Sequence, residues 1–298
     1  MSMTIATTVE DVLVGLSNGA RPIAGGTDLV VGARQGKGEL PEHLIAIDRV
    51  SELAQIGREE GSTRIGSGVT HATLMTDPTV VGRFTGLADA AALVGSPATR
   101  NVGTIGGNVM NGSPALDTGA PLVVLGARAE LRTTEDTRLV DVDELWIAPG
   151  RTSASDDELC TALIVTNLPD TSGSAYVRLE YRRAMEIAIV GAAAAVTLDG
   201  DAIASVRVAL TAVAPTILSV SDLDHCVGKP VDEATLKAVA EAASEQASPI
   251  SDLRASDRYR RKMIGVMARR AVEAATRRAS GEVISVPVNR ALGVGAQS

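Results

Sequence analysis

The chain has 298 residues, 45% of them hydrophobic and 21% charged, which is enough for two or three globular domains. A net charge of −8 and an aromatic content of 2% disfavour general nucleic-acid binding, which needs basic patches and stacking platforms. The N-terminus lacks a basic segment followed by an apolar one, and no run approaches the ~20 apolar residues that span a bilayer. We therefore expect a cytoplasmic protein with no membrane span.

Residues 1–56 are predicted to form a small α/β unit. Thr8 and Asp11 resemble a helix capping box, and the apolar spacing after them predicts a short helix. A strand, the Gly25-Gly26 turn, an apolar helical stretch and a second strand over 43–48 follow.

A second unit is expected over 57–170, with strands and short helices in alternation. Its predicted strands are 64–69, 127–132 and 159–165, and its predicted helices are 71–75, 86–94 and 117–125.

Residues 171–298 are predicted to form a C-terminal α+β domain. Two β-like runs, 187–198 and 203–213, are joined by Asp199-Gly200-Asp201, a sequence suited to a hairpin turn. Helical patterns over 231–247 and 256–278 then predict helices that cover an antiparallel sheet. The last helix carries seven arginines, which indicate either a solvated face or a surface that docks a partner; the charge pattern favours the solvated face.

The side chains available for catalysis are few. The two cysteines, Cys160 and Cys226, are far apart and form no CxxC pair, so this chain cannot supply the four thiolates of an iron–sulfur cluster. Only three histidines occur, with no GxSxG or HExxH motif, which disfavours a hydrolytic triad or a zinc site. We predict no catalytic residue and no metal ligand in this chain. Redox chemistry on a bound organic cofactor fits such a chain, because the cofactor carries the reactive group.

Two glycine-rich loops are the candidate binding elements. The first is AGGTDL (24–29), which follows a short strand, and the second is NVGTIGGN (101–108). Glycines let the backbone approach a ligand closely and point its N–H groups at phosphate oxygens, although a Gly-Gly pair before a helix is more often a simple turn. The second loop matches neither GxGxxG nor the P-loop pattern, so a Rossmann dinucleotide site is disfavoured.

Four blocks in this order and spacing carry a family resemblance: AGGTDL (24–29), GSGVTHATL (66–74), GSPATRNVGTIGGNVMNGSPALD (95–117) and YVRLEYRRAMEIAIVGAAAAVTLDG (176–200). Together they resemble the FAD-binding medium subunit of the xanthine dehydrogenase and aerobic carbon monoxide dehydrogenase family, the molybdenum hydroxylases. The resemblance implies an α+β fold. Two N-terminal subdomains of the vanillyl-alcohol-oxidase (PCMH) type would enclose FAD, and a CO dehydrogenase flavoprotein C-terminal-like domain of antiparallel strands and helices would follow.

The resemblance also implies the residues that contact the cofactor. Both glycine loops would wrap the FAD pyrophosphate and ribose through backbone amides and three polar side chains, and Asp117 would contact a hydroxyl-rich part of FAD. His71 lies in the THA segment beside the cofactor, although a residue at a helix start can equally point to solvent. The positions that the resemblance assigns to cofactor binding are Ile23, Ala24, Gly25, Gly26, Thr27, Asp28, Leu29, Thr70, His71, Gly103, Thr104, Ile105, Gly106, Gly107, Asn108, Asp117, Tyr176 and Arg178.

Near the flavin ring the match is looser. Tyr176 and Arg178 occupy the places of an aromatic and a basic residue that lie near the isoalloxazine in similar proteins, where a cation would stabilise a reduced, anionic flavin. The family often has Asp-Phe or Asp-Ile before AIVG, and this chain has Glu186-Ile187 instead. The sequence therefore leaves open the ring contacts of this segment and the terminal acceptor, whether NAD, oxygen, a quinone or a carrier.

The resemblance implies an electron relay. A large subunit would hold molybdopterin, a small subunit would hold two [2Fe–2S] clusters, and noncovalent FAD on this chain would pass the electrons to an external acceptor. The expected assembly is a dimer of heterotrimers. Two alternatives stay open: a self-sufficient FAD oxidoreductase of the same fold, similar to UDP-N-acetylenolpyruvoylglucosamine reductase, and a nonenzymatic assembly module without cofactor.

Overall fold

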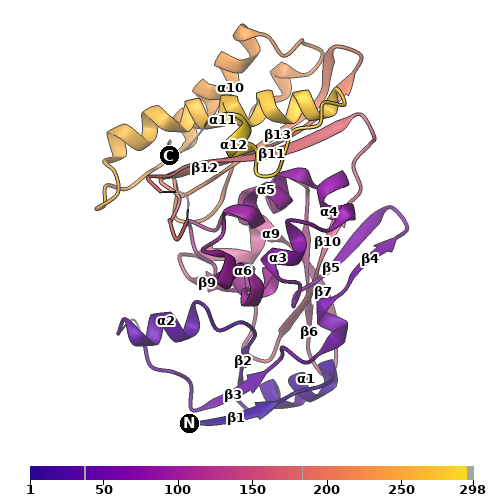
Figure 1. Ribbon diagram of the computed structural model, residues 1–298, viewed down its shortest axis with the longest axis vertical. Helices are drawn as coiled ribbons and strands as arrows, with labels where there is room; N and C mark the ends of the chain where they lie inside the picture. Colours follow the sequence, from indigo (N-terminus) through magenta and orange to yellow (C-terminus); the bar gives the residue numbers. More distant parts are fainter. Residues whose placement is uncertain (37, 183, 294–298) are drawn as a thin grey trace.

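A computed structural model describes residues 1–36, 38–182 and 184–293. Three main sheets follow one another along the long axis: the N-terminal sheet is at the bottom of Figure 1 and the C-terminal sheet at the top. Within the described ranges, no helix combines the length and apolar character that a membrane crossing requires. The division of the chain at residues 56 and 170 into independent domains stays a prediction.

The N-terminal unit is a three-stranded parallel sheet in the order β1-β3-β2. The predicted capping box is confirmed, because the Thr8 hydroxyl accepts from the Asp11 amide and the Asp11 carboxylate accepts from the Thr8 amide, and the helix buries Val9, Val12, Leu13 and Leu16. The following helix buries no residue. The elements are β1 (Ser2–Ile5), α1 (Val9–Ser17), β2 (Arg21–Ile23), α2 (Leu29–Arg34), β3 (His43–Ala46) and η1 (Ser51–Ala54).

The middle unit is a five-stranded antiparallel sheet in the order β4-β5-β10-β6-β7, with short helices packed around it. The predicted helices over 71–75, 86–94 and 117–125 are present with slightly different ends. The sequence did not predict the other four helices of this unit, α4, α6, α7 and α9, and α7 lies inside the second glycine loop. The elements are β4 (Ile56–Glu59), β5 (Ser62–Gly66), α3 (His71–Leu74), α4 (Pro78–Arg83), α5 (Thr85–Leu93), α6 (Pro97–Val102), α7 (Ile105–Met110), α8 (Gly119–Val124), β6 (Arg128–Arg132), β7 (Thr137–Asp141), α9 (Val142–Leu145), β8 (Trp146–Ala148), β9 (Arg151–Thr152) and β10 (Leu159–Thr166).

The C-terminal unit is a four-stranded antiparallel sheet in the order β11-β12-β13-β14. The predicted hairpin is confirmed: Asp199 pairs with Ala202 across a turn in which Gly200 has a φ of +60°. Alanines fill the central strand β12, so α11 packs closely on one face while α5 and α8 approach the sheet from the middle unit. The elements are β11 (Ser172–Leu179), β12 (Val190–Asp199), β13 (Ala202–Thr211), β14 (Leu218–Ser219), η2 (Asp224–Cys226), α10 (Glu233–Gln246), α11 (Asp257–Ala279) and α12 (Val288–Ala291).

The arginines of α11 do not all belong to a solvated face, and for two of them that prediction is wrong. Arg260 is 3% exposed, and its Nη2 donates to Asp252 Oδ1 at 2.7 Å. The side chain of Arg278 is only 6% exposed, and its guanidinium pairs with the fully buried Asp89 of α5. These two arginines therefore tie α11 to neighbouring segments, because a buried cation is tolerated only where protein groups satisfy it.

Candidate functional site

The two glycine loops touch each other although they are 78 residues apart in sequence (25 versus 103). A β-carbon built on Gly25 would lie 1.9 Å from the carbonyl oxygen of Val102 and 3.0 Å from the amide nitrogen of Gly103. A real β-carbon does not approach a backbone oxygen this closely. Glycine at position 25 is therefore what allows the first loop to lie against the start of the second.

The first loop presents unused hydrogen-bond donors. Gly26 has a φ of +65°, in the left-handed region that glycine adopts without strain, and this turns the chain sharply before α2. Within the described residues, the amides of Gly25, Gly26, Thr27 and Asp28 have no hydrogen-bond acceptor. Four consecutive free amides in a loop form a concave donor surface of the kind that binds phosphate oxygens.

The second loop uses most of its donors internally. The amides of Ile105 and Gly106 donate to the carbonyls of Val69 and Ser67 at 2.9 and 2.8 Å, and Asn108 N donates to Thr104 O. The Thr104 hydroxyl caps α7 by accepting from Gly107 N at 3.1 Å. The Asn108 side chain accepts from the Thr118 hydroxyl at 2.8 Å. This loop therefore contributes shape and a rigid wall. Of the three polar side chains expected to contact the cofactor, Thr27, Thr104 and Asn108, the last two bond within the protein and Thr27 is the freest.

His71 lies at the junction of the loops. Its amide donates to Gly103 O at 3.0 Å, and a β-carbon at Gly103 would lie 3.4 Å from the His71 Cδ2 and 3.5 Å from the Thr27 hydroxyl. The ring is 2% exposed, so the alternative in which it points to solvent is wrong. Its Nδ1 is buried without a hydrogen-bond partner in the part of the chain that the structure describes. A buried nitrogen that lacks a partner fits a ligand group at this place, because such atoms are otherwise costly.

Burial, and to a lesser degree the charge of Arg100, lower the pKa of His71 from its ordinary 6.5 to about 4. Between pH 6.5 and about 4 the unfolded chain binds a proton that the folded chain does not, so the free energy of unfolding falls as the pH falls. Between pH 7.5 and 5.0 we expect His71 to account for a loss of about 2 kcal/mol.

Urea unfolding of the cofactor-free chain at both pH values tests this. The pH-dependent loss should shrink by about 2 kcal/mol in His71→Gln and should not shrink in the control His43→Gln, whose ring is exposed. Equal losses in the wild type and in His71→Gln would contradict the assignment.

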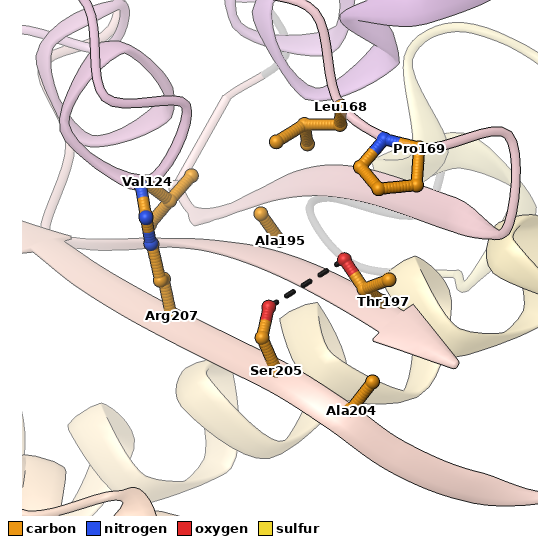
Figure 2. Close-up of a pocket in the computed structure, with 8 residues that line it drawn as sticks. All are labelled: Val124, Leu168, Pro169, Ala195, Thr197, Ala204, Ser205 and Arg207. Atoms are coloured by element: carbon orange, nitrogen blue, oxygen red, sulfur yellow. Dashed lines mark hydrogen bonds between the residues drawn. The ribbon is translucent and has the colours of Figure 1, made fainter. Parts of the chain in front are cut away.

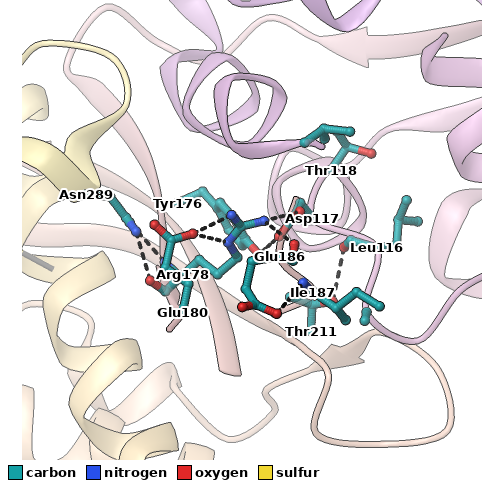
Figure 3. Close-up of polar contacts among 12 residues, drawn as sticks. Leu116, Asp117, Thr118, Tyr176, Arg178, Glu180, Glu186, Ile187, Thr211 and Asn289 are labelled. Carbon is teal, nitrogen blue, oxygen red and sulfur yellow. Dashed lines mark hydrogen bonds and ion pairs between the residues drawn. The ribbon is translucent and has the colours of Figure 1, made fainter. Parts of the chain in front are cut away.

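Asp117, Tyr176 and Arg178 form one buried cluster, shown in Figure 3. The Tyr176 hydroxyl donates to Asp117 Oδ1 at 2.7 Å, and Arg178 Nη1 donates to Asp117 Oδ2 at 2.7 Å. Arg178 also pairs with Glu180. Tyr176 and Arg178 are two residues apart on β11 and so lie on the same face of the strand. Their side chains meet the segment between α7 and α8 that holds Asp117.

The cluster is almost completely closed to solvent. Tyr176 and Arg178 are 0% exposed and Asp117 is 8% exposed. Burial, and the charge of Asp117 next to it, raise the pKa of Tyr176 well above its usual range, and the carboxylates hold the pKa of Arg178 high. Tyr176 and Arg178 are therefore shielded from solvent, and both bond to the Asp117 carboxylate. That carboxylate has acceptor capacity beyond the two bonds it makes, which suits a hydroxyl of a ligand.

The segment after β11 differs from the family pattern at Glu186-Ile187. The Glu186 carbonyl accepts from Arg178 at 3.3 Å, its carboxylate pairs with Arg182, and Ile187 is 47% exposed. The Met185 amide donates to Gly95 O at 3.0 Å, which places this segment beside the approach to the second glycine loop.

The chain is similar to known proteins over most of its length. Residues 1–167 match the family described as FAD binding domain in molybdopterin dehydrogenase, and residues 175–275 match the CO dehydrogenase flavoprotein C-terminal domain. The xanthine dehydrogenase FAD-binding subunit of Escherichia coli O157:H7 is 30% identical over 267 residues, covering 89% of this chain and 91% of the relative. The carbon monoxide dehydrogenase medium chain of Hydrogenophaga pseudoflava is 34% identical, covering 87% and 90%.

This chain belongs to the FAD-binding subunits of the molybdopterin dehydrogenases.

Solved structures of this family have the same fold. Carbon monoxide dehydrogenase from Hydrogenophaga pseudoflava superposes with a TM-score of 0.88 at 30% identity, covering 92% of this chain and 96% of the neighbour. Quinoline 2-oxidoreductase from Pseudomonas putida 86 gives 0.87 at 26% identity, covering 94% and 98%. The predicted fold class and the family prediction are confirmed, and the chain is an oxidoreductase subunit with an FAD-binding domain.

Two residues of the site were not found from the sequence. Asn289 of α12 accepts from Arg178 N at 2.9 Å and donates to Arg178 O at 2.8 Å, across 111 positions, and no sequence pattern signals it. Arg100 lies inside the RNVGTIGGN block that carried the family resemblance, but its charge acts on His71 only through the folded arrangement.

Other hollows and side-chain groups do not compete with this site. A cavity of about 310 Å³ lies where the end of α8 and the 168–169 linker meet β12 and β13 (Figure 2), away from both glycine loops. Cys160 and Cys226 are both buried, and burial raises the pKa of the Cys160 thiol to about 12. Among the residues that the structure describes, no group of three or more His, Cys, Asp or Glu side chains is placed to hold a metal ion.

Proposed function

We propose that this chain is the electron-relay subunit of a molybdenum hydroxylase complex. Its noncovalent FAD receives electrons from the [2Fe–2S] clusters of a partner subunit and passes them to an external acceptor. The observation that carries the proposal is the contact between Gly25 and Val102-Gly103, because it brings both glycine loops to one place while the amides of 25–28 remain free. FAD supplies the redox chemistry there, and the protein supplies binding and orientation.

The residues of this chain fit such a cofactor. Free amides from Gly25 to Asp28 suit the pyrophosphate, and the His71 Nδ1, buried without a partner among the described residues, suits a polar group beside it. Asp117, held by Tyr176 and Arg178, suits a hydroxyl of the ribityl or ribose part. The remaining positions from the sequence, Ile23 to Leu29, Thr70 and Gly103 to Asn108, are proposed as the walls of the same site.

The partners in this proposal are a molybdopterin-binding large subunit and an iron–sulfur small subunit, assembled as a dimer of heterotrimers in the cytoplasm. With two buried cysteines, this chain does not supply a cluster itself. The relatives named above include medium chains of carbon monoxide dehydrogenase, a name that supports a division of labour among subunits.

The test is to coexpress the chain with both partner subunits and to purify it through a tag on this chain. We expect a yellow preparation that brings down both partners and releases FAD into the supernatant on acid precipitation, with flavin reduced when the complex meets its substrate. A fully loaded preparation that releases no FAD contradicts the cofactor assignment. An isolated chain that oxidises a substrate by itself favours the self-sufficient oxidoreductase instead.

A further inference from the structure

Arg100 is a half-buried cation whose charge no described carboxylate neutralises. It lies in the last turn of α6, three residues before Gly103, and its Nη1 donates to the Val94 carbonyl at 2.9 Å. Within the described residues its side chain forms no ion pair and no other hydrogen bond. The guanidinium therefore keeps donors available for a further acceptor.

The groups around Arg100 add positive charge. The fields of Arg290 and Arg178 both act on its guanidinium, and burial together with these two charges lowers its pKa. Arg290 follows Asn289 on α12, and Asn289 is tied to the backbone of Arg178 by two hydrogen bonds. Arg178 is neutralised by Asp117 and Glu180, whereas Arg290 is exposed and has no carboxylate partner among the described residues.

An anion would stabilise this arrangement. A cation that is partly removed from water and placed near like charges is destabilised unless an opposite charge reaches it. Arg100 also acts on His71, whose ring lies against Gly103, so the missing anion would lie between the glycine loops and the Asp117 cluster.

We propose that Arg100, supported by Arg290, binds an anionic part of FAD, and that Arg100 takes the role of the cation near the flavin that the family resemblance implied for Arg178. The inference rests on the proposed FAD site. Two parts of the cofactor have this chemistry: the pyrophosphate, and the flavin ring when it is reduced and anionic. Arg178 acts in this arrangement as a positioning residue, because it reaches the site through Asp117.

The experiment compares Arg100→Gln with the wild-type chain. Glutamine keeps a donor for the Val94 carbonyl and removes the charge, and Arg258→Gln, an exposed position on α11, removes the same charge elsewhere. Binding of oxidised FAD, ADP and riboflavin to the full-length apo chain is measured by fluorescence, and the flavin midpoint potential by dye-linked titration.

A loss of about tenfold in FAD and ADP affinity, with riboflavin unaffected, assigns the pyrophosphate as the anion. Unchanged affinity for oxidised FAD with a tenfold weaker preference for reduced flavin, about 30 mV for a two-electron couple, assigns the ring. If Arg100→Gln and Arg258→Gln behave alike in affinity and potential, the inference is overturned.

A second readout does not depend on FAD. Arg100→Gln should raise the pKa of His71 above about 4 in an NMR titration of the apo chain, because it removes a nearby positive charge. An unchanged His71 pKa would show that the charge of Arg100 does not reach the loops, and would overturn the inference. If the wild-type chain takes up no FAD at all, the proposed function fails first, and pyrophosphate binding equal in wild type and Arg100→Gln would then overturn the anion site as well.

Discussion

Gly25→Ala should lower the affinity for FAD by at least about 100-fold, or about 2.7 kcal/mol. The new β-carbon would lie 1.9 Å from the Val102 carbonyl oxygen. The backbone of residue 25 fixes the position of the β-carbon and the oxygen is itself a backbone atom, so no side-chain rotation relieves the clash. The first loop must therefore move by more than 1 Å, roughly, to reach ordinary contact distance, and its free amides move with it. Fluorescence titration of the apo chain with FAD measures the change.

The matched control is Gly32→Ala, which lies in α2 and whose β-carbon would meet no atom within 4 Å. Its FAD affinity should stay within about twofold of the wild type, because the replacement creates no clash and alanine is the better helix former. Equal FAD affinity in Gly25→Ala and Gly32→Ala would remove the first loop from the cofactor site.

The second loop offers a test that separates folding from binding. A β-carbon on Gly106 would lie 2.4 Å from the Ser67 β-carbon, so Gly106→Val disturbs the packing of the protein itself. On Gly107 the nearest atom is the Thr104 hydroxyl at 3.1 Å, and no other heavy atom lies within 4 Å. Gly107→Ala needs only a small shift of the Thr104 hydroxyl, so it should fold nearly as well as the wild type and yet bind FAD more weakly. A folded Gly107→Ala chain that binds FAD normally would mean that no ligand approaches this position.

Asp89→Ala should destabilise the chain by about 3–5 kcal/mol and lower the Tm by about 10 °C. Asp89 is 0% exposed, and its carboxylate accepts from Arg278, from Val288 N at 2.8 Å and from Tyr176 N at 3.2 Å. Its removal leaves a buried guanidinium and two buried amides without an acceptor, and each unpartnered group carries a desolvation cost. Differential scanning calorimetry measures the loss.

The control for Asp89→Ala is an ion pair between a carboxylate and a basic side chain that lies on the surface. Lys237 and Glu241 lie one turn apart on α10, with side chains 72% and 61% exposed. Glu241→Ala should cost less than about 0.5 kcal/mol. The double variant Asp89→Leu/Arg278→Met should recover part of the loss, because it removes the buried charge as well. No recovery in the double variant would show that the buried cation is not the cause of the destabilisation.

Asp89 also connects the cofactor region with the C-terminal sheet. Asp89 belongs to α5 of the middle unit, Arg278 to α11, and Val288 to the start of α12. Asp89 also accepts from the amide of Tyr176 on β11, the strand that carries both Tyr176 and Arg178. Asp89→Ala should thus also loosen the strand that holds the partners of Asp117.

Local sequence signals predicted most of the elements. Capping residues, glycine turns and apolar periodicity predicted α1, the β12–β13 hairpin and the helices α10 and α11, because each depends on residues close in the chain. The helices α6 and α7 were missed. Glycines dominate the second loop, and only the caps supplied by Ser96 and Thr104, together with contacts to residues 67–71, make helix favourable there.

The glycine loops were visible in the sequence, and so was the family to which they belong. The sequence by itself determined that residues 24–29 and 101–108 carry unusual backbone freedom, because glycine placement is a local property. The tertiary structure alone decided that Gly25 lies against Val102. Among the residues that the structure describes, it also left the amides of the first loop free while the second loop uses most of its own, and it gave Arg178 carboxylate partners while Arg100 has none. These outcomes depend on which distant groups become neighbours, and charge compensation and hydrogen-bond satisfaction are settled only when the chain has folded.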